Sequence, residues 1–437
     1  MRLLPLVAAT FFMVSGGPYG IEDILGAGYV KGLILLVTVP FVWSLPTALM
    51  IGELASALPE EGGFYVWVRR ALGPFWGYQE AWLSLSASIF DMAIYPTLFV
   101  LYLGRLFPAW TAGWHAVAWE LGLIALCCAW NLLGAPAVGE GSVALGVALL
   151  APFAVLLAVA AWHGAHLAGH GGGHGAWAAT GAEGSLSTAV LVALWNYMGW
   201  DNASTVAREV DHPQRNYPRA MLVATVATAV VYVVPLAAMA WAGIAPGEFK
   251  TGSWADVAAG LAGPWLGVAI VVGGTVMAVG MFNALMMSYA RLPMVLAEDG
   301  LLPAALKRKN RHGVPWVAVL ACAAGWAVAL QFSFERLISL DILLYGASLV
   351  LEFAALVVLR VREPGLQRPF RAGNFVFACL IGAAPTLLLF YAAWTSRSER
   401  MAGLPALFLG SLIAAGGPLF YWISTAAARS RRTVGIP

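Results

Sequence analysis

The chain has 437 residues, of which 61% are hydrophobic and only 11% are charged. Soluble domains carry roughly 25% charged residues, so the charged fraction is less than half of the usual value. This composition excludes a soluble globular enzyme, a disordered chain and a nucleic-acid-binding protein, and it leaves a polytopic membrane protein. The net charge of +2 is too small to indicate a partner.

Apolar stretches of spanning length recur along the chain, given that a helix needs about 20 residues to cross a bilayer. They lie near residues 3–28, 31–57, 75–105, 111–133, 141–162, 186–208, 218–243, 264–297, 314–330, 335–360, 374–395 and 401–426. No small-residue cleavage site follows the first stretch, so we expect it to be a span of the mature protein. We predict an all-α polytopic membrane protein with twelve transmembrane helices in one domain, residues 1–437.

Basic residues are unevenly divided between the two sides of the predicted membrane. With twelve spans both termini lie on one side, and the segments on that side hold 18 of the 24 Lys and Arg residues. The positive-inside rule assigns such a side to the cytoplasm. We therefore predict a multi-pass protein of the cell (plasma) membrane with both termini cytoplasmic.

Two predicted spans are interrupted by residues that do not sustain a helix. Residues 15–20 read SGGPYG and are followed by Glu22 and Asp23, while residues 195–202 read WNYMGWDN. Glycine and proline weaken or break helices, and the freed backbone groups cannot face lipid. Gly17 and Gly199 are 182 residues apart, which is about five helices, so the breaks occupy matching places in two halves. This pattern predicts an inverted repeat with a central site; a single kink of this kind would more simply reflect packing.

Several motifs resemble known transporters. Residues 53–68 (ELASALPEEGGFYVWV) and 71–74 (ALGP) resemble the span-two to span-three segment of amino acid–polyamine–organocation (APC) superfamily permeases. A closer similarity, to plant and protozoan polyamine uptake transporters, is carried by GGPYGIED (16–23), PFWGYQ (74–79), DMAIYP (91–96) and WNYMGWDNAST (195–205). Gly280-Met281-Phe282 is followed by Asn283 instead of the acids of the plant proteins, which favours an amino-acid substrate.

The resemblance implies a five-plus-five inverted repeat in which helices 1 and 6 are broken and the substrate binds between spans 1, 3, 6 and 8. The first repeat would then cover residues 1–162, the second residues 186–360, and two additional helices residues 374–426. It also implies alternating access driven by a proton or by exchange.

Three acids lie where a membrane protein seldom places them without a function: Glu22, Asp91 and Asp201. A cationic substrate or a transported proton would supply the missing counter-charge. Aromatic residues, which bind ammonium groups by cation–π attraction, accompany these acids in sequence: Tyr19, Tyr95, Trp195, Tyr197 and Trp200. Alternatively, Glu22 and Asp201 could cap half-helices, Asp91 could pair with an arginine, and the aromatic residues could serve packing.

The same breaks could bind a zwitterion. The amides of Gly16, Gly17 and Gly20 could hold a carboxylate, as half-helix N-termini do, and the backbone carbonyls near Trp195 could hold the amino group. The backbone therefore fits both substrates, and the acids favour a cationic one.

We predict a secondary active transporter of organic amines, either polyamines or cationic amino acids, with the lipid bilayer as its environment and a proton coupled through Glu22. The alternatives are a neutral amino-acid permease or exchanger and an amine-binding membrane sensor without net transport. No zinc-binding His-Glu pair, nucleophile elbow or phosphate loop indicates an enzyme, a metal or a cofactor. Glu53, Glu60 and Glu61 are expected to form an ion network with Arg69 and Arg70. Asp341 and Glu352 are expected to be structural, with Arg291 or another base as partner.

Overall fold

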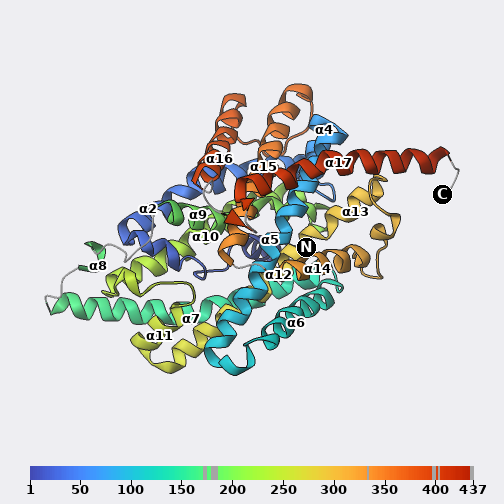
Figure 1. Cartoon of the computed structure of the whole chain (residues 1–437). Coiled ribbons are helices and arrows are strands. Elements are labelled where there is room, and N and C mark those ends of the chain that lie inside the picture. The colour runs from blue at the N-terminus through green and yellow to red at the C-terminus, as the bar shows by residue number, and fades with distance from the viewer. Residues whose placement is uncertain (171–174, 179–185, 332–333, 396–399, 402–403, 434–437) are drawn as a thin grey trace.

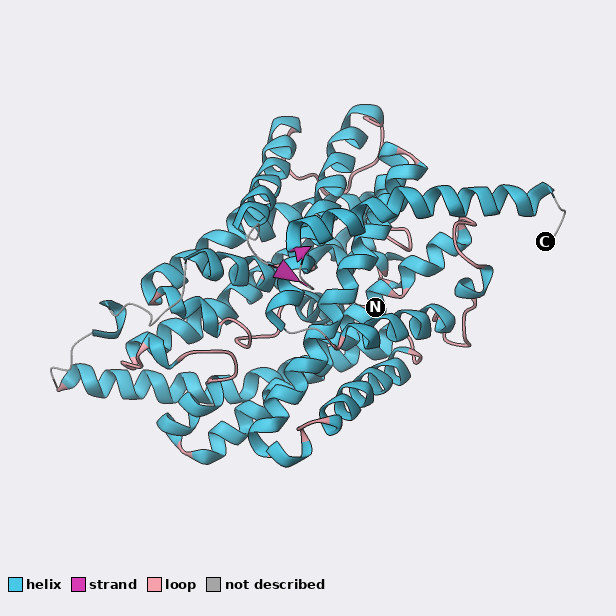
Figure 2. Cartoon of the chain, viewed as in Figure 1, coloured by secondary structure: helices cyan, strands magenta, loops and turns pink. Residues whose placement is uncertain are grey.

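The computed structural model describes residues 1–170, 175–178, 186–331, 334–395, 400–401 and 404–433. The described chain is almost entirely helical (Figure 2), apart from an antiparallel pair of two-residue strands, β1 (Arg400–Met401) and β2 (Leu404–Pro405). The helices are α1 (Leu3–Val14), α2 (Tyr29–Val39), α3 (Leu45–Ala57), α4 (Phe64–Leu72), α5 (Pro74–Leu106), α6 (Trp114–Asn131), α7 (Ala135–Gly169), α8 (Gly175–Ala178), α9 (Leu186–Asn196), α10 (Pro213–Trp241), α11 (Trp254–Ala262), α12 (Pro264–Tyr289), α13 (Arg291–Glu298), α14 (Trp316–Ala329), α15 (Phe334–Arg362), α16 (Phe375–Thr395) and α17 (Ala406–Thr433).

Seven helical stretches of the described chain are long and apolar enough to cross a membrane. They are Tyr29–Ala57, Pro74–Leu106, Ala135–Gly169, Pro213–Trp241, Pro264–Glu298, Leu340–Arg362 and Ala406–Ala426. Three shorter apolar helices of the described residues are Leu3–Val14, Trp316–Ala329 and Phe375–Tyr391. The predicted multi-pass, helical membrane protein is confirmed, and the count of twelve spans stays a prediction.

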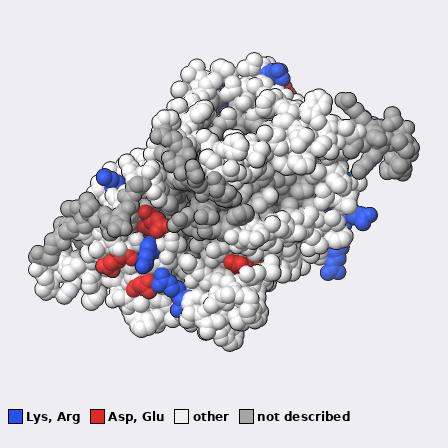
Figure 3. Space-filling view, viewed as in Figure 1, with Lys and Arg blue, Asp and Glu red and all other residues white. Residues whose placement is uncertain are grey.

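The helices differ in how much of their apolar surface the protein itself covers. The most apolar windows of α5 and α15 are 72% and 67% buried, whereas those of α7 and α17 are 22% and 17% buried. Figure 1 shows α17 extending away from the bundle that contains α5. On the face shown in Figure 3 charged side chains are few. The central helices α5 and α15 therefore pack against protein, and the outer helices present apolar side chains to the surroundings.

The two interruptions lie at the glycines that the sequence indicated. α1 ends at Val14, and the chain resumes as a 3₁₀ turn at Glu22–Ala27, with Gly17 and Gly20 at φ values of 69° and 82°. α9 ends at Asn196, and a 3₁₀ turn follows at Trp200–Thr205 after Gly199, whose φ is 92°. Because L side chains rarely adopt these φ values, glycine permits both breaks.

The two breaks contact each other although they are about 180 residues apart in the chain. The side-chain amide of Asn196 donates a hydrogen bond of 3.0 Å to the carbonyl oxygen of Gly20. A Cβ atom on Gly199 would lie 2.3 Å from the carbonyl oxygen of Met13, so the second break packs directly on the end of α1. Both half-helices are thereby fixed to one position in the middle of the protein.

We predict that Gly199→Ala lowers the thermal unfolding midpoint in detergent, because the added methyl group meets backbone at 2.3 Å and the residue keeps a positive φ. Such backbone strain costs about 1–3 kcal/mol, before any cost of separating the two breaks. The control is Gly122→Ala on the exposed side of α6, where an added Cβ meets nothing within 4 Å. Alanine there favours the helix by about 0.8–1 kcal/mol. Equal midpoints for the two variants would contradict the close packing of the breaks.

Candidate functional site

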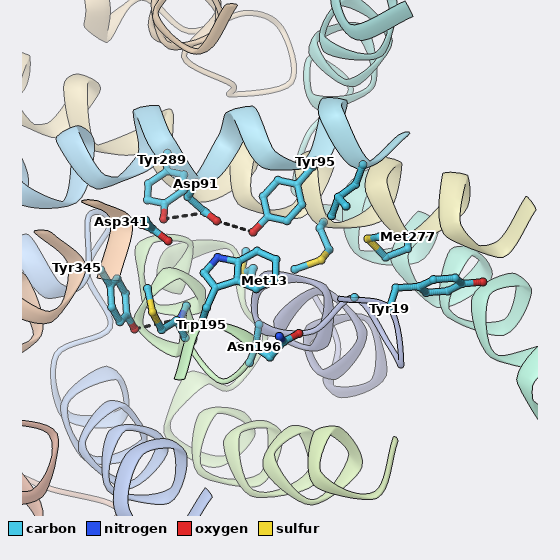
Figure 4. A pocket seen from close by; sticks show the side chains of 16 residues that line it. Met13, Tyr19, Asp91, Tyr95, Trp195, Asn196, Met277, Tyr289, Asp341 and Tyr345 are labelled. Atoms are coloured by element: carbon cyan, nitrogen blue, oxygen red, sulfur yellow. Dashed lines mark hydrogen bonds between the residues drawn. The ribbon is translucent and has the colours of Figure 1, made fainter. Parts of the chain in front are cut away.

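A pocket lies where the two breaks meet helices α5, α12 and α15 (Figure 4). Its lining includes Met13 at the end of α1, Gly16 and Tyr19 from the first break, and Trp195, Asn196, Met198 and Gly199 at the second. Asp91 and Tyr95 come from α5, Met277, Met281 and Tyr289 from α12, and Asp341 and Tyr345 from α15. Segments from both halves of the sequence therefore build one site.

Two acids stand on the wall of this pocket, and both are buried. The Tyr95 hydroxyl donates a 2.6 Å hydrogen bond to Asp91 Oδ1, and the Tyr289 hydroxyl lies 3.5 Å from Oδ2. Asp341 lies beside Asp91, and its Oδ2 atom has no hydrogen-bond partner among the described residues. No Lys, Arg or His is among the described residues that line the pocket. The pocket therefore offers negative charge and hydrogen-bond acceptors without a built-in counter-charge.

Aromatic side chains make up much of the remaining wall. Trp195 lies close to the two acids in Figure 4. The Tyr19 hydroxyl donates to the carbonyl oxygen of Ile270 at 2.5 Å, and its ring makes edge contacts with Tyr102 and Phe153. Aromatic faces attract ammonium groups, so acids and aromatics together form a chemically suitable environment for an organic cation.

Of the residues expected at the site, Gly16, Tyr19, Asp91, Tyr95 and Trp195 line the pocket. Gly17 and Gly20 lie in the first break but outside that lining.

Three further expected residues lie behind the pocket wall. The Tyr197 hydroxyl donates to the carbonyl of Leu36, and Trp200 Nε1 donates to the carbonyl of Tyr197, so both side chains are engaged in packing. Asp201 Oδ1 accepts a 2.6 Å hydrogen bond from Tyr345, whose hydroxyl also accepts from the Gly199 N–H at 3.0 Å. Tyr345 therefore separates Asp201 from the pocket.

Asp341 and Tyr345 are pocket residues that the sequence reasoning did not assign to the site. The expectation that Asp341 and Glu352 meet Arg291 or another base is wrong for the described residues. Arg291 hydrogen-bonds to Glu209 and the carbonyl of Met287 instead. No base lines the pocket beside Asp341, and neither carboxyl oxygen of Glu352 has a partner there. The available signal was the spacing of four residues between Asp341 and Tyr345, which places both on one face of α15.

Glu22 is fully buried in the first break and does not line the pocket. Its Oε1 accepts hydrogen bonds from the Tyr102 hydroxyl at 3.2 Å and from the Gly252 N–H at 3.0 Å, while Oε2 has no partner among the described residues. The neighbouring Asp23 accepts hydrogen bonds from the N–H and the hydroxyl of Thr251. These contacts tie the first break to the segment before α11.

Ion pairs join the segment that follows the second break to the loop before α4 and the loop before α14. Arg291 pairs with Glu209 and lies 3.7 Å from Glu61, which also accepts from Lys309 at 3.2 Å. The Gly62 N–H donates to the carbonyl of Thr205 at 3.1 Å, which joins the loop before α4 to the second break. The free volume of the pocket is about 20 Å³, room for little more than one water molecule. The pocket is therefore narrow in this conformation.

The expectation that Glu53 and Glu61 pair with Arg69 and Arg70 is wrong, because all four residues have other partners. Glu53 is fully buried and pairs with Arg360 and, at 3.2 Å, with Arg368, while Arg69 pairs with Asp299. Arg70 donates two hydrogen bonds, of 2.9 and 2.7 Å, to Glu363, and these hold the pKa of the Glu363 carboxyl below its usual value.

Among the residues that the structure describes, no group of three or more His, Cys, Asp and Glu is placed to hold a metal ion.

Comparison with known proteins gives the chain a family context. The amino acid permease family matches residues 7–423. The chain is similar to polyamine transporter PUT1 of Oryza sativa subsp. japonica, at 33% identity over 94% of this chain and 77% of that protein. It is similar to polyamine transporter RMV1 of Arabidopsis thaliana, at 32% identity over 94% and 84%. It is also similar to the serine/threonine exchanger SteT of Bacillus subtilis (strain 168), at 25% identity over 87% and 86%.

We predict that Glu53→Gln destabilises the protein strongly, because it leaves Arg360 and Arg368 without their carboxylate in a buried setting. Breaking a buried pair from one side costs about 3–5 kcal/mol. The matched control is Glu363→Gln at the half-exposed pair with Arg70, where a loss within about 1 kcal/mol is expected. Thermal or denaturant unfolding in detergent measures both, and a control variant as unstable as Glu53→Gln would refute the ranking.

Proposed function

The chain belongs to the amino acid permease family, within the APC superfamily, and we propose that it carries organic amines across the cell membrane. The single observation that carries the choice of amines is the pair of buried acids, Asp91 and Asp341, on a pocket lined by no described base. The substrates would be polyamines or cationic amino acids.

An amine supplies what this pocket lacks. A buried carboxylate without a partner is costly, and in the middle of a membrane an ionised side chain costs about 2.5–3.5 kcal/mol on insertion scales. An ammonium group near Asp91 and Asp341 would compensate this charge and donate hydrogen bonds to the free oxygen of Asp341. Trp195 and Tyr95 would add cation–π attraction.

The proposed mechanism is alternating access by a twelve-span protein with a five-plus-five repeat over residues 1–162 and 186–360, and with residues 374–426 as two additional helices. Both termini would lie in the cytoplasm. The support is that the two breaks meet at the pocket, with ion pairs on one side and the Glu22 and Asp23 hydrogen bonds on the other. Opening the pocket toward one side would then require only the ion pairs to break, and opening it toward the other only the hydrogen bonds of Glu22 and Asp23.

Proton coupling through Glu22 is part of the proposal. One oxygen of this buried carboxyl is held by Tyr102 and Gly252, and the other is without a partner among the described residues. A proton on that free oxygen would remove the charge and weaken the hydrogen bonds that the carboxylate accepts. Loading a proton would thereby loosen the contact between the first break and the segment before α11.

A neutral amino-acid permease or exchanger is the second candidate. The observation that favours it is Gly16, which presents backbone of the first break to the pocket, together with the similarity to SteT. A carboxylate bound to that backbone would place an amino acid where we propose an amine. A sensor without transport would use the same residues, and net flux distinguishes it from a transporter.

The test is uptake of labelled spermidine into proteoliposomes, competed by putrescine, arginine and leucine, with and without an inward proton gradient. We expect spermidine to accumulate, putrescine to compete and the gradient to accelerate uptake. Uptake of leucine, with spermidine ignored, would replace the amine proposal by the amino-acid one. Binding without accumulation would favour a sensor.

We predict that Asp91→Asn weakens amine binding at least tenfold, because it removes a charged hydrogen-bond acceptor worth about 1.5–3 kcal/mol. Asp341→Asn is expected to act in the same direction. Asp256→Asn is the control, since Asp256 is exposed and pairs with Arg105 outside the pocket lining. Equal affinities for all three variants, measured by titration calorimetry, would exclude the acids as the amine site.

A further inference from the structure

Helices α5 and α15 run antiparallel and face each other with carboxyl groups at matching heights. At one end Arg362 donates to the carbonyl of Ala71 just before α5, and further along Asp341 and Asp91 line the same pocket. In this register Glu80 of α5 lies level with Glu352 of α15. Each glutamate is eleven residues from the pocket acid on its own helix, which corresponds to about 16 Å along the axis.

The polar side chains occupy one face of each helix. On α5, Glu80, Ser84 and Asp91 follow the spacing of four and eleven residues that keeps side chains on one stripe. On α15, Asp341, Tyr345, Ser348 and Glu352 follow the same rule, and all are buried. The two stripes meet at the α5–α15 interface.

Glu80 and Glu352 are buried acids that pair with no base among the described residues. Neither carboxylate oxygen of Glu352 has a hydrogen-bond partner among the described residues, and its side chain is 0% exposed. Glu80 accepts a 2.8 Å hydrogen bond from Ser84 at one oxygen, and its other oxygen is unpartnered. Two further acids, Asp201 and Glu80, lie near Glu352. Three carboxyl oxygens therefore remain inside the interface without a hydrogen-bond partner among the described residues, and the acids nearby offer them no counter-charge.

Asp201 connects this pair to the pocket. It accepts the hydrogen bond of Tyr345, which lines the pocket, and it lies near Asp341, Glu80 and Glu352. The acids thus form a series from Asp91 and Asp341, past Asp201, to Glu80 and Glu352. Ser84 and Ser348 are small and lie between the ends of this series.

We infer that Glu80 and Glu352 form a second ammonium subsite, so that the protein binds a linear polyamine lengthwise between α5 and α15. This inference rests on the proposed amine transport and names its substrate class. One terminal ammonium binds at Asp91 and Asp341, an inner one near Asp201, and the far one at Glu80 and Glu352. Extended spermine is about 16 Å long at ordinary C–C and C–N bond lengths, which matches the separation of the two pairs.

Binding of a long amine requires Tyr345 to move. In this conformation its hydroxyl bridges Asp201 and the Gly199 N–H, and the ring stands between the pocket and the inner acids. A short diamine would bind at Asp91 and Asp341 alone once the pocket widens, and it would leave the hydrogen bonds of Tyr345 in place. The length of the amine, more than its total charge, then decides whether the second subsite contributes.

The experiment compares putrescine, spermidine and spermine binding to the full-length protein by titration calorimetry. For the wild type we expect affinity to rise at least tenfold from putrescine to spermine. Glu352→Gln, which keeps shape and removes charge, should lower spermine affinity at least tenfold and change putrescine affinity less than twofold. Glu80→Gln should do the same, whereas Glu120→Gln, a buried acid on α6 outside the pocket lining, should change neither.

Retained putrescine binding shows that each variant is folded, and the wild-type length series tests the inference even if a variant fails to fold. Equal loss of putrescine and spermine binding in Glu352→Gln, a flat wild-type series, or an altered proton dependence of uptake with unchanged spermine affinity would overturn it. The last result would identify the pair as a proton site, since adjacent buried carboxyl groups share a proton readily. If the wild type binds no amine, the proposed function itself fails. If amine binding still depends on Asp91 but Glu352→Gln binds spermine as tightly as the wild type, only the second subsite fails.

Discussion

Backbone groups freed by the two helix breaks must find partners inside the protein, because a membrane offers none. The structure meets this constraint with side chains from distant segments. Asn196 donates to the carbonyl of Gly20, the Trp254 indole donates to the carbonyl of Pro18, and the Tyr345 hydroxyl accepts from the Gly199 N–H. Asn196 and Tyr345 also line the pocket. The same side chains therefore satisfy the freed backbone groups and form part of the pocket wall.

The partners of the freed backbone also set the electrostatics of the site. Tyr345 holds Gly199 with the same hydroxyl that it donates to Asp201, so the geometry of the second break fixes the position of one buried acid. Tyr95 similarly restrains Asp91 from within α5. Tyrosine hydroxyls can orient a carboxylate without neutralising it, which leaves its charge available to a cation. Arginine would have neutralised the acids and removed the reason to bind an amine.

Local chemistry in the sequence was sufficient to predict the breaks and part of the site. Gly17, Gly20 and Gly199 carry the positive φ values that glycine permits, and Asp91 and Tyr95 are joined across one helical turn as their spacing indicated. Long-range pairings could not be read in this way. Glu80 and Glu352 come level only because α5 and α15 pack antiparallel in a particular register. Arg291 was assigned to the wrong acid because the fold brings Glu209 to it. Periodicity predicts which face of a helix is polar, but the partner of that face depends on tertiary packing.

The two breaks are held by different kinds of interaction, and this difference bears on the proposed transport. The first break is held by hydrogen bonds to Glu22 and Asp23, and the second by ion pairs centred on Arg291. Hydrogen bonds to a buried carboxylate disappear or weaken when it is protonated, whereas guanidinium pairs keep their charge at physiological pH. A proton would therefore act on the contacts of one break and leave those of the other intact. An ammonium group near Asp201 would act on the second break through Tyr345, since competition for that carboxylate loosens the hydrogen bond that positions the tyrosine at Gly199. A proton at Glu22 would in this way act on the contacts of the first break and an amine on a contact of the second, as the proposed coupling of their movement requires.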